Sequence, residues 1–429
     1  MKSSRGVTLI DTVVGVALML IVFLGIFAAF QLSVDVVLNN KARAGAVALA
    51  DERMEYVRSL PYSSIGTVGG IPSGTLAQSE SVTLNGVAYT RRTLVEYVDD
   101  PKDGTGAADT TGTADYKAVK VDVSWPSHTG ARDVAVVSRF EPSSGLESTV
   151  TGGTLTINVV DASGQPVSNA QVTVVNASSS PTVNLTTYSN VNGSITLPGT
   201  PAASNYAITV TKSGYSTAQT YASSAQNPSP SPANLTVSNN QTTSSTFAID
   251  QLSSLTILTL LYDSTTTIGS VPVTVTSAKT IGTGIHKYSA SVGGTGSATT
   301  TLSSMEWDTY TMSVPSTTGY DLASSCSPQP VSLSPGASVS TTLYLAPHTS
   351  NSLPVKVVSG TDGSLISGAS VQLSKTGFSA TQTTDSCGQT FFSSLTTGAY
   401  TLSVSAPGHA TFNASNVQST STVYAVTLN

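Results

Sequence analysis

An uncharged apolar run near the start of the chain constrains how everything after it can fold. The run extends from Thr12 to Phe30, and Lys2 and Arg5 precede it. At about 1.5 Å per helical residue, its length comes close to the ~30 Å hydrocarbon core of a bilayer. A secretory signal peptide has a shorter apolar run. We therefore expect residues 7–30 to form a transmembrane helix that stays in the membrane.

The charges around this span predict its orientation. After Lys2 and Arg5, the next basic residue is Lys41. The positive-inside rule therefore keeps the first residues in the cytoplasm and exports everything after Phe30. This predicts a single-pass protein of the cytoplasmic membrane with its C-terminus outside. Asp11 lies at the edge of the span, where a lone carboxylate costs a few kcal/mol, so it needs a partner.

The leader Met1–Gly6, followed by Val7 and by an acid at Asp11, resembles the N-terminal motif of the type IV pilin and pseudopilin family. The resemblance implies that a prepilin peptidase cuts between Gly6 and Val7 and that Val7 is then N-methylated. It also implies that Asp11, fifth in the mature chain, neutralises the α-amino group of a neighbouring subunit during fibre assembly. The family usually has Phe and Glu where this chain has Val7 and Asp11. An ordinary signal-anchor helix, with Asp11 among the lipid headgroups, is the alternative.

The helical pattern continues beyond the membrane but becomes amphipathic. Apolar residues recur at spacings of three and four at Val47, Ala50, Met54 and Val57. Pro61 ends the pattern because proline cannot continue a helix. A helix over residues 7–60 would be roughly 80 Å long, with one half in a membrane or fibre core and the other half on a globular head, as pilins are built.

Residues 61–142 predict a small antiparallel sheet, which we interpret as the pilin head. Asn85-Gly86 is a strong two-residue hairpin signal between strands 80–84 and 87–98. Alternation predicts a further strand with one face on a core, formed by Val119, Val121, Val123 and Trp125. A turn is expected at 126–130 and a returning strand at 132–140. The Asp- and Gly-rich segment 99–115 fits a solvated loop better than a calcium site, because its spacing does not match the EF-hand pattern.

After a Pro/Ser/Gly-rich linker at 143–153, the chain repeats itself in three units, 154–250, 254–347 and 352–429. Each unit contains two glycines separated by a similar interval, and these pairs are Gly193 with Gly214, Gly296 with Gly319, and Gly388 with Gly408. Such regularity predicts three copies of one module.

The repeat resembles the carboxypeptidase regulatory-like domain, a transthyretin-like β-sandwich of about seven strands. The resemblance is carried in the first unit by 164–170 and 212–215, and in the third by 385–388, 398–400 and 406–409. It implies a non-catalytic module with a stalk or adhesive role. The expected fold is thus an α+β pilin part, a long helix with a small antiparallel sheet, followed by an all-β part of three tandem seven-stranded transthyretin-like or Ig-like β-sandwich modules.

Composition excludes several function classes. Charged residues make up only 10% of the chain, against about 25% in an average soluble protein. The net charge of −6 shows no excess of basic residues of the kind that binds nucleic acid. The four histidines are scattered, and none has a carboxylate or cysteine at metal-ligand spacing. No nucleophile motif is present. We therefore expect no enzyme activity, no metal and no cofactor.

Two other residue groups are candidates for function. In an exported protein, Cys326 and Cys387 could form a disulfide that joins the second and third units, with free thiols as the alternative. Aromatic residues concentrate in the second unit (Trp307, Tyr310, Tyr320) and the third (Phe391, Phe392, Tyr400, Phe412). Core packing explains most of them better than an exposed adhesive patch does.

The sequence as a whole predicts a minor type IV pilin-like subunit, placed near the tip of a pilus because so large an appendage would crowd the shaft. Its expected partners are other pilins, the assembly machinery, prepilin peptidase, the cytoplasmic membrane, and a surface polysaccharide or cell-surface ligand. After assembly it would be extracellular. A pseudopilin of a type II secretion-like system and a static membrane-anchored surface protein are the alternatives.

Overall fold

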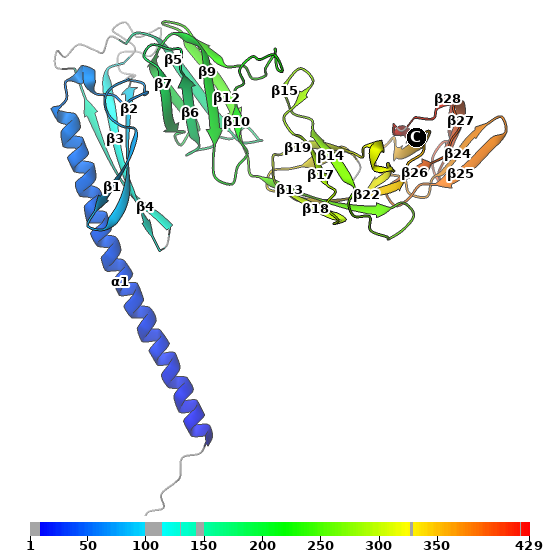
Figure 1. Cartoon of the computed structure of the whole chain (residues 1–429), viewed down its shortest axis with the longest axis horizontal. Helices are drawn as coiled ribbons and strands as arrows, with labels where there is room; N and C mark the ends of the chain where they lie inside the picture. The colour runs from blue at the N-terminus through cyan, green and yellow to red at the C-terminus, as the bar shows by residue number, and fades with distance from the viewer. Residues whose placement is uncertain (1–8, 99–113, 129, 143–149, 327–328, 421) are drawn as a thin grey trace, which may run out of the picture.

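A single long helix leads into a chain of β-sheets (Figure 1). The structure, a computed structural model, describes residues 9–98, 114–128, 130–142, 150–326, 329–420 and 422–429. α1 (Leu9–Ser59) is unbroken over 51 residues, which corresponds to about 76 Å. It ends just before Pro61, as expected, and the short 3₁₀ helix η1 (Tyr62–Ser64) follows. The prediction of one N-terminal helix followed by an all-β region is confirmed.

The C-terminal half of α1 packs against a four-stranded antiparallel sheet, and together they form the unit that we call the head. The strands, in the spatial order β1-β2-β3-β4, are β1 (Ser79–Leu84), β2 (Val87–Val98), β3 (Tyr116–Ser127) and β4 (Gly130–Phe140). Asn85 and Gly86 have φ of 52° and 80°, so the predicted hairpin is confirmed. β3 continues through Ser127, which makes the turn into β4 shorter than expected.

The predicted apolar faces of the head are mostly confirmed. Val119, Val121 and Val123 of β3 are fully buried. On the helix, Ala50, Met54 and Val57 are buried, but Val47 is 37% exposed, so its assignment to the packed face is wrong. The helix turns Ala42, Ala46 and Leu49 toward the sheet instead. The small side chains of Ala42 and Ala46 let the helix approach the sheet closely.

Beyond the head, three pairs of facing sheets follow along the chain. We name them the first, second and third sandwich. The first sandwich comprises β5 (Gly153–Val160), β6 (Gln171–Asn176), β7 (Val183–Tyr188), β8 (Ser194–Thr200), β9 (Ala203–Thr211), β10 (Ala218–Gln219), β11 (Leu235–Val237) and β12 (Thr242–Ala248).

The second sandwich comprises β13 (Ser253–Leu261), β14 (Pro272–Ser277), β15 (Thr280–Gly282), β16 (Ile285–His286), β17 (Ser289–Gly293), β18 (Thr299–Met305), β19 (Asp308–Ser313), the 3₁₀ helix η3 (Ser316–Thr318), β20 (Tyr320–Cys326), β21 (Val331–Leu333) and β22 (Ser338–Pro347). The third comprises β23 (Leu353–Ser359), β24 (Ser370–Lys375), β25 (Phe378–Thr383), β26 (Gln389–Phe392), β27 (Ala399–Ser405), β28 (Phe412–Gln418) and β29 (Tyr424–Leu428).

The three sandwiches share one unusual pairing. In each of them the last strand runs parallel to the first: β12 with β5, β22 with β13 and β29 with β23. The third sandwich has seven described strands, but the first has eight, and the second has a 2-stranded hairpin, β15–β16, in addition to two four-stranded sheets. Short extra strands account for the difference, since the two-residue β10 adds to one sheet and the hairpin forms a small sheet of its own, and neither alters the shared pairing.

One repeated glycine shows why the sequence pattern recurs. Gly193 and Gly388 have φ of 68° and 64°, and a Cβ on either would meet the carbonyl oxygen of Val159 or Val357, respectively. The backbone N–H of Val159 donates to Gly193 O and that of Val357 to Gly388 O. Both glycines are therefore needed where the same turn lies against the first strand of its sandwich.

The sandwiches extend in series from the side of the head, while the N-terminal half of α1 extends away in another direction (Figure 1). Each sandwich has its own core of buried apolar side chains. The chain therefore has the shape of a rod with a long side arm, and the C-terminus lies in the last sandwich of the arm.

Candidate functional site

The N-terminal half of α1 is an unpartnered apolar rod. Among the described side chains from Leu9 to Leu38, the large apolar ones are between 40% and 80% exposed. The helix contains a window of mean hydropathy 2.9 of which no part is buried within the chain, so by length and composition it could cross a membrane. A protein in water rarely exposes a contiguous apolar surface larger than a few hundred Å². This half of the helix therefore requires an apolar environment that the rest of the chain does not provide.

The residues predicted to direct processing and assembly are Gly6, Val7 and Asp11. Gly6 and Val7 lie outside the described residues. Asp11 belongs to α1, but its side chain is likewise outside the description. Cleavage after Gly6, methylation of Val7 and pairing of Asp11 therefore stay predictions. The Asp- and Gly-rich segment is also largely outside the described residues.

A charged cluster joins the C-terminal half of α1 to the head sheet. Glu80 of β1 accepts a hydrogen bond from Arg91 Nε at 2.9 Å and is also paired with Arg53 of the helix. Arg91 Nη1 donates to the carbonyl oxygen of Leu49 at 3.1 Å, so β2 is tied directly to the helix backbone. Burial, and then the nearby Arg91, lower the pKa of Arg53 from its ordinary value. The cluster therefore ties α1 to both β1 and β2.

This cluster was missed in reading the sequence, although the signal for it was present. Arg91 is two positions from the buried residues Tyr89 and Thr93 of β2. Its side chain therefore lies on the same face as theirs, which is the core face. A charged residue on that face needs a partner of opposite charge. Glu80 lies directly opposite Arg91 in the β1–β2 register.

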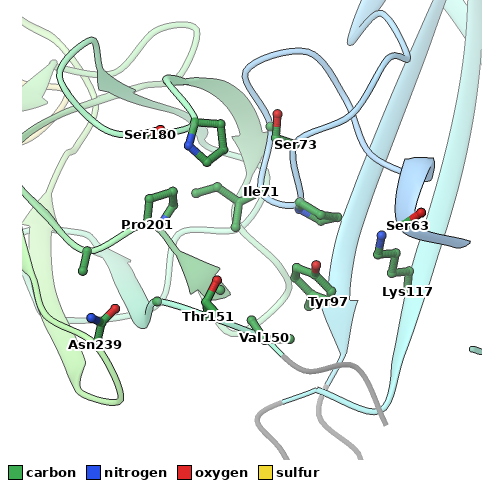
Figure 2. Close-up of a pocket in the computed structure, with 16 residues that line it drawn as sticks. Ser63, Ile71, Ser73, Tyr97, Lys117, Val150, Thr151, Ser180, Pro201 and Asn239 are labelled. Carbon is green, nitrogen blue, oxygen red and sulfur yellow. The ribbon is translucent and has the colours of Figure 1, made fainter. Parts of the chain in front are cut away.

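A cavity of about 430 Å³ lies between the head and the first sandwich (Figure 2). Lys117 and Tyr97 line it from the head, and Thr151, Ser180 and Asn239 line it from the other side. Its lining is largely polar and comes from both units. Binding at this place would therefore bridge the head and the arm.

Lys117 is the most unusual residue of this cavity. Only 2% of its surface is exposed, and its ammonium donates to the carbonyl oxygens of Tyr62 at 2.9 Å and Ile65 at 2.7 Å. It also lies 4.6 Å from the ring centroid of Tyr62 and 5.4 Å from that of Tyr97, which are cation–π distances. Burial lowers the pKa of Lys117 to about 8. Among the described residues no carboxylate is within ion-pair distance of Lys117. Its two hydrogen bonds to backbone carbonyls instead stabilise the turn after α1.

The two cysteines form a disulfide. Cys326, at the end of β20, is joined to Cys387, in the turn before β26, with 5.3 Å between the Cα atoms. The bridge therefore connects the second sandwich to the third. By the loop-entropy model, closing a loop of about 60 residues contributes about 4 kcal/mol to stability.

The aromatic residues form cores. Tyr310, Tyr400, Phe391 and Phe392 are each 3% exposed or less, as the core interpretation predicted. Trp307 is half-buried, and the ammonium of Lys279 lies 3.1 Å from the centroid of its ring. These side chains therefore do not supply an exposed adhesive patch.

The polar side chains of the described residues were compared with the groups that hold metal ions in proteins. Within them, no group of three or more His, Cys, Asp or Glu side chains could hold a metal ion. His348 Nδ1 lies 2.7 Å from Asp321 Oδ1, and the backbone N–H of Thr349 donates to the other oxygen of the same carboxylate. This contact fixes the linker between the second and third sandwiches. Among the described residues, the geometry offers an exposed apolar helix and docked junctions between units.

Solved structures with some similarity to this chain include two pilins. They include the TIE protein of Bacillus anthracis (12% identity over 82% of this chain and 72% of that one, TM-score 0.20). They also include a streptococcal ancillary pilin (12% identity, 65% and 98% covered, TM-score 0.19) and GBS52, a minor pilin of Streptococcus agalactiae (12% identity, 46% and 97% covered, TM-score 0.22). TM-scores this low do not establish a shared fold, so these likenesses carry no weight for function.

No curated protein matches the chain as a whole or in part. Two of its segments match the model of one protein family. Residues 154–250 match the model of the carboxypeptidase regulatory-like domain, and residues 352–429 match the same model. These segments hold the first and third sandwiches. Two segments that make up less than half of the chain thus carry the pattern of the carboxypeptidase regulatory-like domain.

Proposed function

We propose that this protein is a minor type IV pilin-like subunit that enters a pilus through the N-terminal half of α1 and displays its sandwiches at or near the tip. The observation that carries the proposal is the division of α1 into two halves. One half exposes apolar side chains on all sides, and the other is packed on the head sheet. Such a helix can move from a bilayer into a bundle of identical or related helices without losing an apolar environment.

The placement of the arm favours a position at the tip. The arm leaves the head to one side of α1 (Figure 1) and contains three sandwiches. Subunits packed closely along a shaft would have to accommodate this arm at every position. A subunit at the end of the fibre has no neighbour above it, so the arm is free to meet another surface there.

Display of a binding surface is the role proposed for the arm. Its sheets carry few charges, and their outer faces are rich in Ser and Thr. Surfaces of this kind bind through many weak hydrogen bonds, which suits a polysaccharide or a cell-surface ligand. No covalent chemistry is part of this proposal.

Mass spectrometry of the mature N-terminus tests the processing step. The proposal expects a chain that begins at Val7 and carries a methyl group on its α-amine. An intact Met1 would instead support the static membrane anchor and would exclude assembly through this motif.

The role of Asp11 is tested by Asp11→Asn, which removes the charge and retains the shape. We expect normal cleavage but loss of incorporation into fibres, measured by immunogold labelling of sheared pili. Asp51→Asn is the matched control, because Asp51 is an exposed acid on the head half of the same helix. Equal incorporation of both variants would contradict the proposal.

Deletion of residues 254–429, which contain the second and third sandwiches, separates assembly from binding. We expect pili to form and attachment to be lost. Loss of pili without a separate attachment defect would count against the adhesive role. Labelling of a secretion pseudopilus, with no surface pili, would identify the secretion-system alternative.

A further inference from the structure

Two edge strands of the arm form backbone hydrogen bonds with glutamine side chains. β7 is at the end of the sheet β10-β9-β6-β7, and β20 is at the end of the sheet β18-β13-β22-β20. An edge strand presents N–H and C=O groups that its own sheet leaves unpaired, and such edges promote association between molecules. In this chain, glutamine side chains of the neighbouring units cover both edges.

Gln78 of the head covers β7. Its Nε2 donates to the carbonyl oxygen of Asn184 at 2.7 Å, and its Oε1 accepts from the N–H of Thr186 at 3.0 Å. Beside it, the N–H of Asn184 donates to the carbonyl oxygen of Gly69 at 2.8 Å. One carboxamide thus takes the place of a peptide group in an additional strand, because it offers one acceptor and one donor on the same side.

Gln389 of the third sandwich covers β20 in the same way. Its Nε2 donates to the carbonyl oxygen of Ser325 at 2.8 Å, and its Oε1 accepts from the N–H of Ser325 at 3.3 Å. Gln389 is only 6% exposed, so this pairing is shielded from water. A buried amide that lost these partners would leave polar groups unsatisfied on both sides of the junction.

We propose that Gln78 and Gln389 are strand clamps that hold the head rigidly on the first sandwich and the second sandwich rigidly on the third, and that close both edges against other chains. The clamps carry no charge, so neither salt nor moderate pH weakens them directly. The inference concerns the junctions that join the head and the sandwiches, and it stands whether or not α1 enters a fibre.

Other contacts at the two junctions agree with rigid docking. At the first junction, Ile71 of the head is 2% exposed and belongs to the core of the first sandwich, and the guanidinium of Arg92 lies 5.6 Å from the ring centroid of Tyr188. At the second junction, the rings of Tyr262 and Phe391 meet edge to face, 6.0 Å apart. Each clamp therefore lies beside apolar contacts that exclude water.

The first test is hydrogen exchange of the full chain in lipid nanodiscs, resolved to single amides. In Gln78→Glu a carboxylate can still accept from Thr186, but it cannot donate to Asn184. We expect the backbone N–H groups of Asn184 and Thr186 to lose protection by about tenfold. Gln389→Glu is expected to reduce the protection of the backbone N–H group of Ser325 by a similar factor. Gln372→Glu, on an exposed face of β24, is the matched control and should change neither site.

The second test measures the rigidity of the first junction from the distribution of distances between two spin labels, recorded by double electron–electron resonance. Spin labels at Thr83→Cys and Val191→Cys report the first junction, because Thr83 lies on β1 and Val191 is 84% exposed on the first sandwich. The unchanged chain should give a narrow distance distribution, and Gln78→Glu a broad one. Below about pH 4 the new carboxyl group becomes protonated and can again donate and accept, so the narrow distribution should return.

The rescue at acidic pH separates loss of a clamp from loss of folding. A variant that failed to fold would not recover on protonation, and Gln78→Met then serves as the second variant, because it removes both hydrogen bonds without adding charge. If Gln78→Met and Gln389→Met keep the protection and the narrow distances of the unchanged chain, the clamp proposal is overturned.

Discussion

Gly45 illustrates how one residue sets the distance between α1 and the head sheet. A Cβ at this position would lie 2.5 Å from the hydroxyl oxygen of Tyr89. That hydroxyl group donates to the carbonyl oxygen of Ala42 at 2.9 Å, one turn earlier in the helix. Glycine weakens a helix, so its presence here is explained by the space that Tyr89 needs.

Gly45→Ala should therefore destabilise the head even though alanine favours helix by about 1 kcal/mol. Overpacking of a core typically costs about 1–3 kcal/mol, so we expect a net loss on thermal unfolding in detergent. Gly25→Ala is the control, because a Cβ there meets nothing within 4 Å. If Gly45→Ala is as stable as Gly25→Ala, the close contact with Tyr89 is not a constraint on the helix.

Lys117 makes the stability of the head depend on pH. Burial lowers its pKa to about 8 in the folded chain, against about 10.4 for an exposed lysine. Between these values the unfolded chain binds more protons than the folded one, so stability rises with pH. Below about pH 8 both states are protonated, and the buried charge keeps its full cost.

Lys117→Met should remove this rise, because the side chain keeps its length and loses its charge. The measurement is the free energy of unfolding of both chains from pH 7 to pH 10.5. Other groups also titrate in this range, so the difference between the two chains is the relevant quantity. A difference that does not change with pH would contradict burial of a charged Lys117.

At the scale of elements, α1 performs two tasks that meet near Lys41. Before this residue, its large apolar side chains have no partner within the described chain. After it, Ala42, Ala46 and Met54 belong to the core of the head. The helix is continuous, so movement of one half is transmitted directly to the other.

A chain that begins at Lys41 should therefore fold as a soluble monomer with an intact head. We expect its size-exclusion profile to be monomeric and its unfolding to remain cooperative. A chain that begins at Asp51 loses four buried core residues, Ala42, Ala46, Leu49 and Ala50. That longer truncation should destabilise the head by several kcal/mol at typical costs for core deletions. Aggregation of the Lys41 chain would show that the apolar half is needed for folding.

At the scale of the whole molecule, the arm must transmit force if it binds a surface while the fibre is pulled. The disulfide shortens the path that force takes through the arm. It joins two residues separated by 61 positions, and the segment between them includes β21 to β25. Under tension this segment cannot be extended while the bond is intact.

Single-molecule stretching between the head and the C-terminus tests this prediction. Reduction of the disulfide should lengthen the fully unfolded chain by about 200 Å, at about 3.3–3.6 Å for each released residue. A chain with Cys326→Ser and Cys387→Ser should show the longer contour with or without reductant. Equal contour lengths before and after reduction of the unchanged chain would mean that the bond is not in the force path.

Much of this architecture was determined by local sequence. The apolar run from Thr12 to Phe30 predicts a membrane-spanning helix because its length and lack of charge match the hydrocarbon core of a bilayer. Asn85-Gly86 determines a hairpin because both residues tolerate positive φ. Alternation in β3 identifies its buried face, and the same alternation places Lys117 there. These features depend on neighbours along the chain, which a sequence displays directly.

Only the tertiary structure decided how the units meet. The rotation of α1 that exposes Val47 and buries Ala46 depends on the shape of the sheet opposite. The clamps of Gln78 and Gln389 join groups far apart in sequence, and a glutamine in a polar chain carries no local sign of such a role. Junctions between units arise from complementary surfaces in space, and spacing along the chain contains no measure of that complementarity.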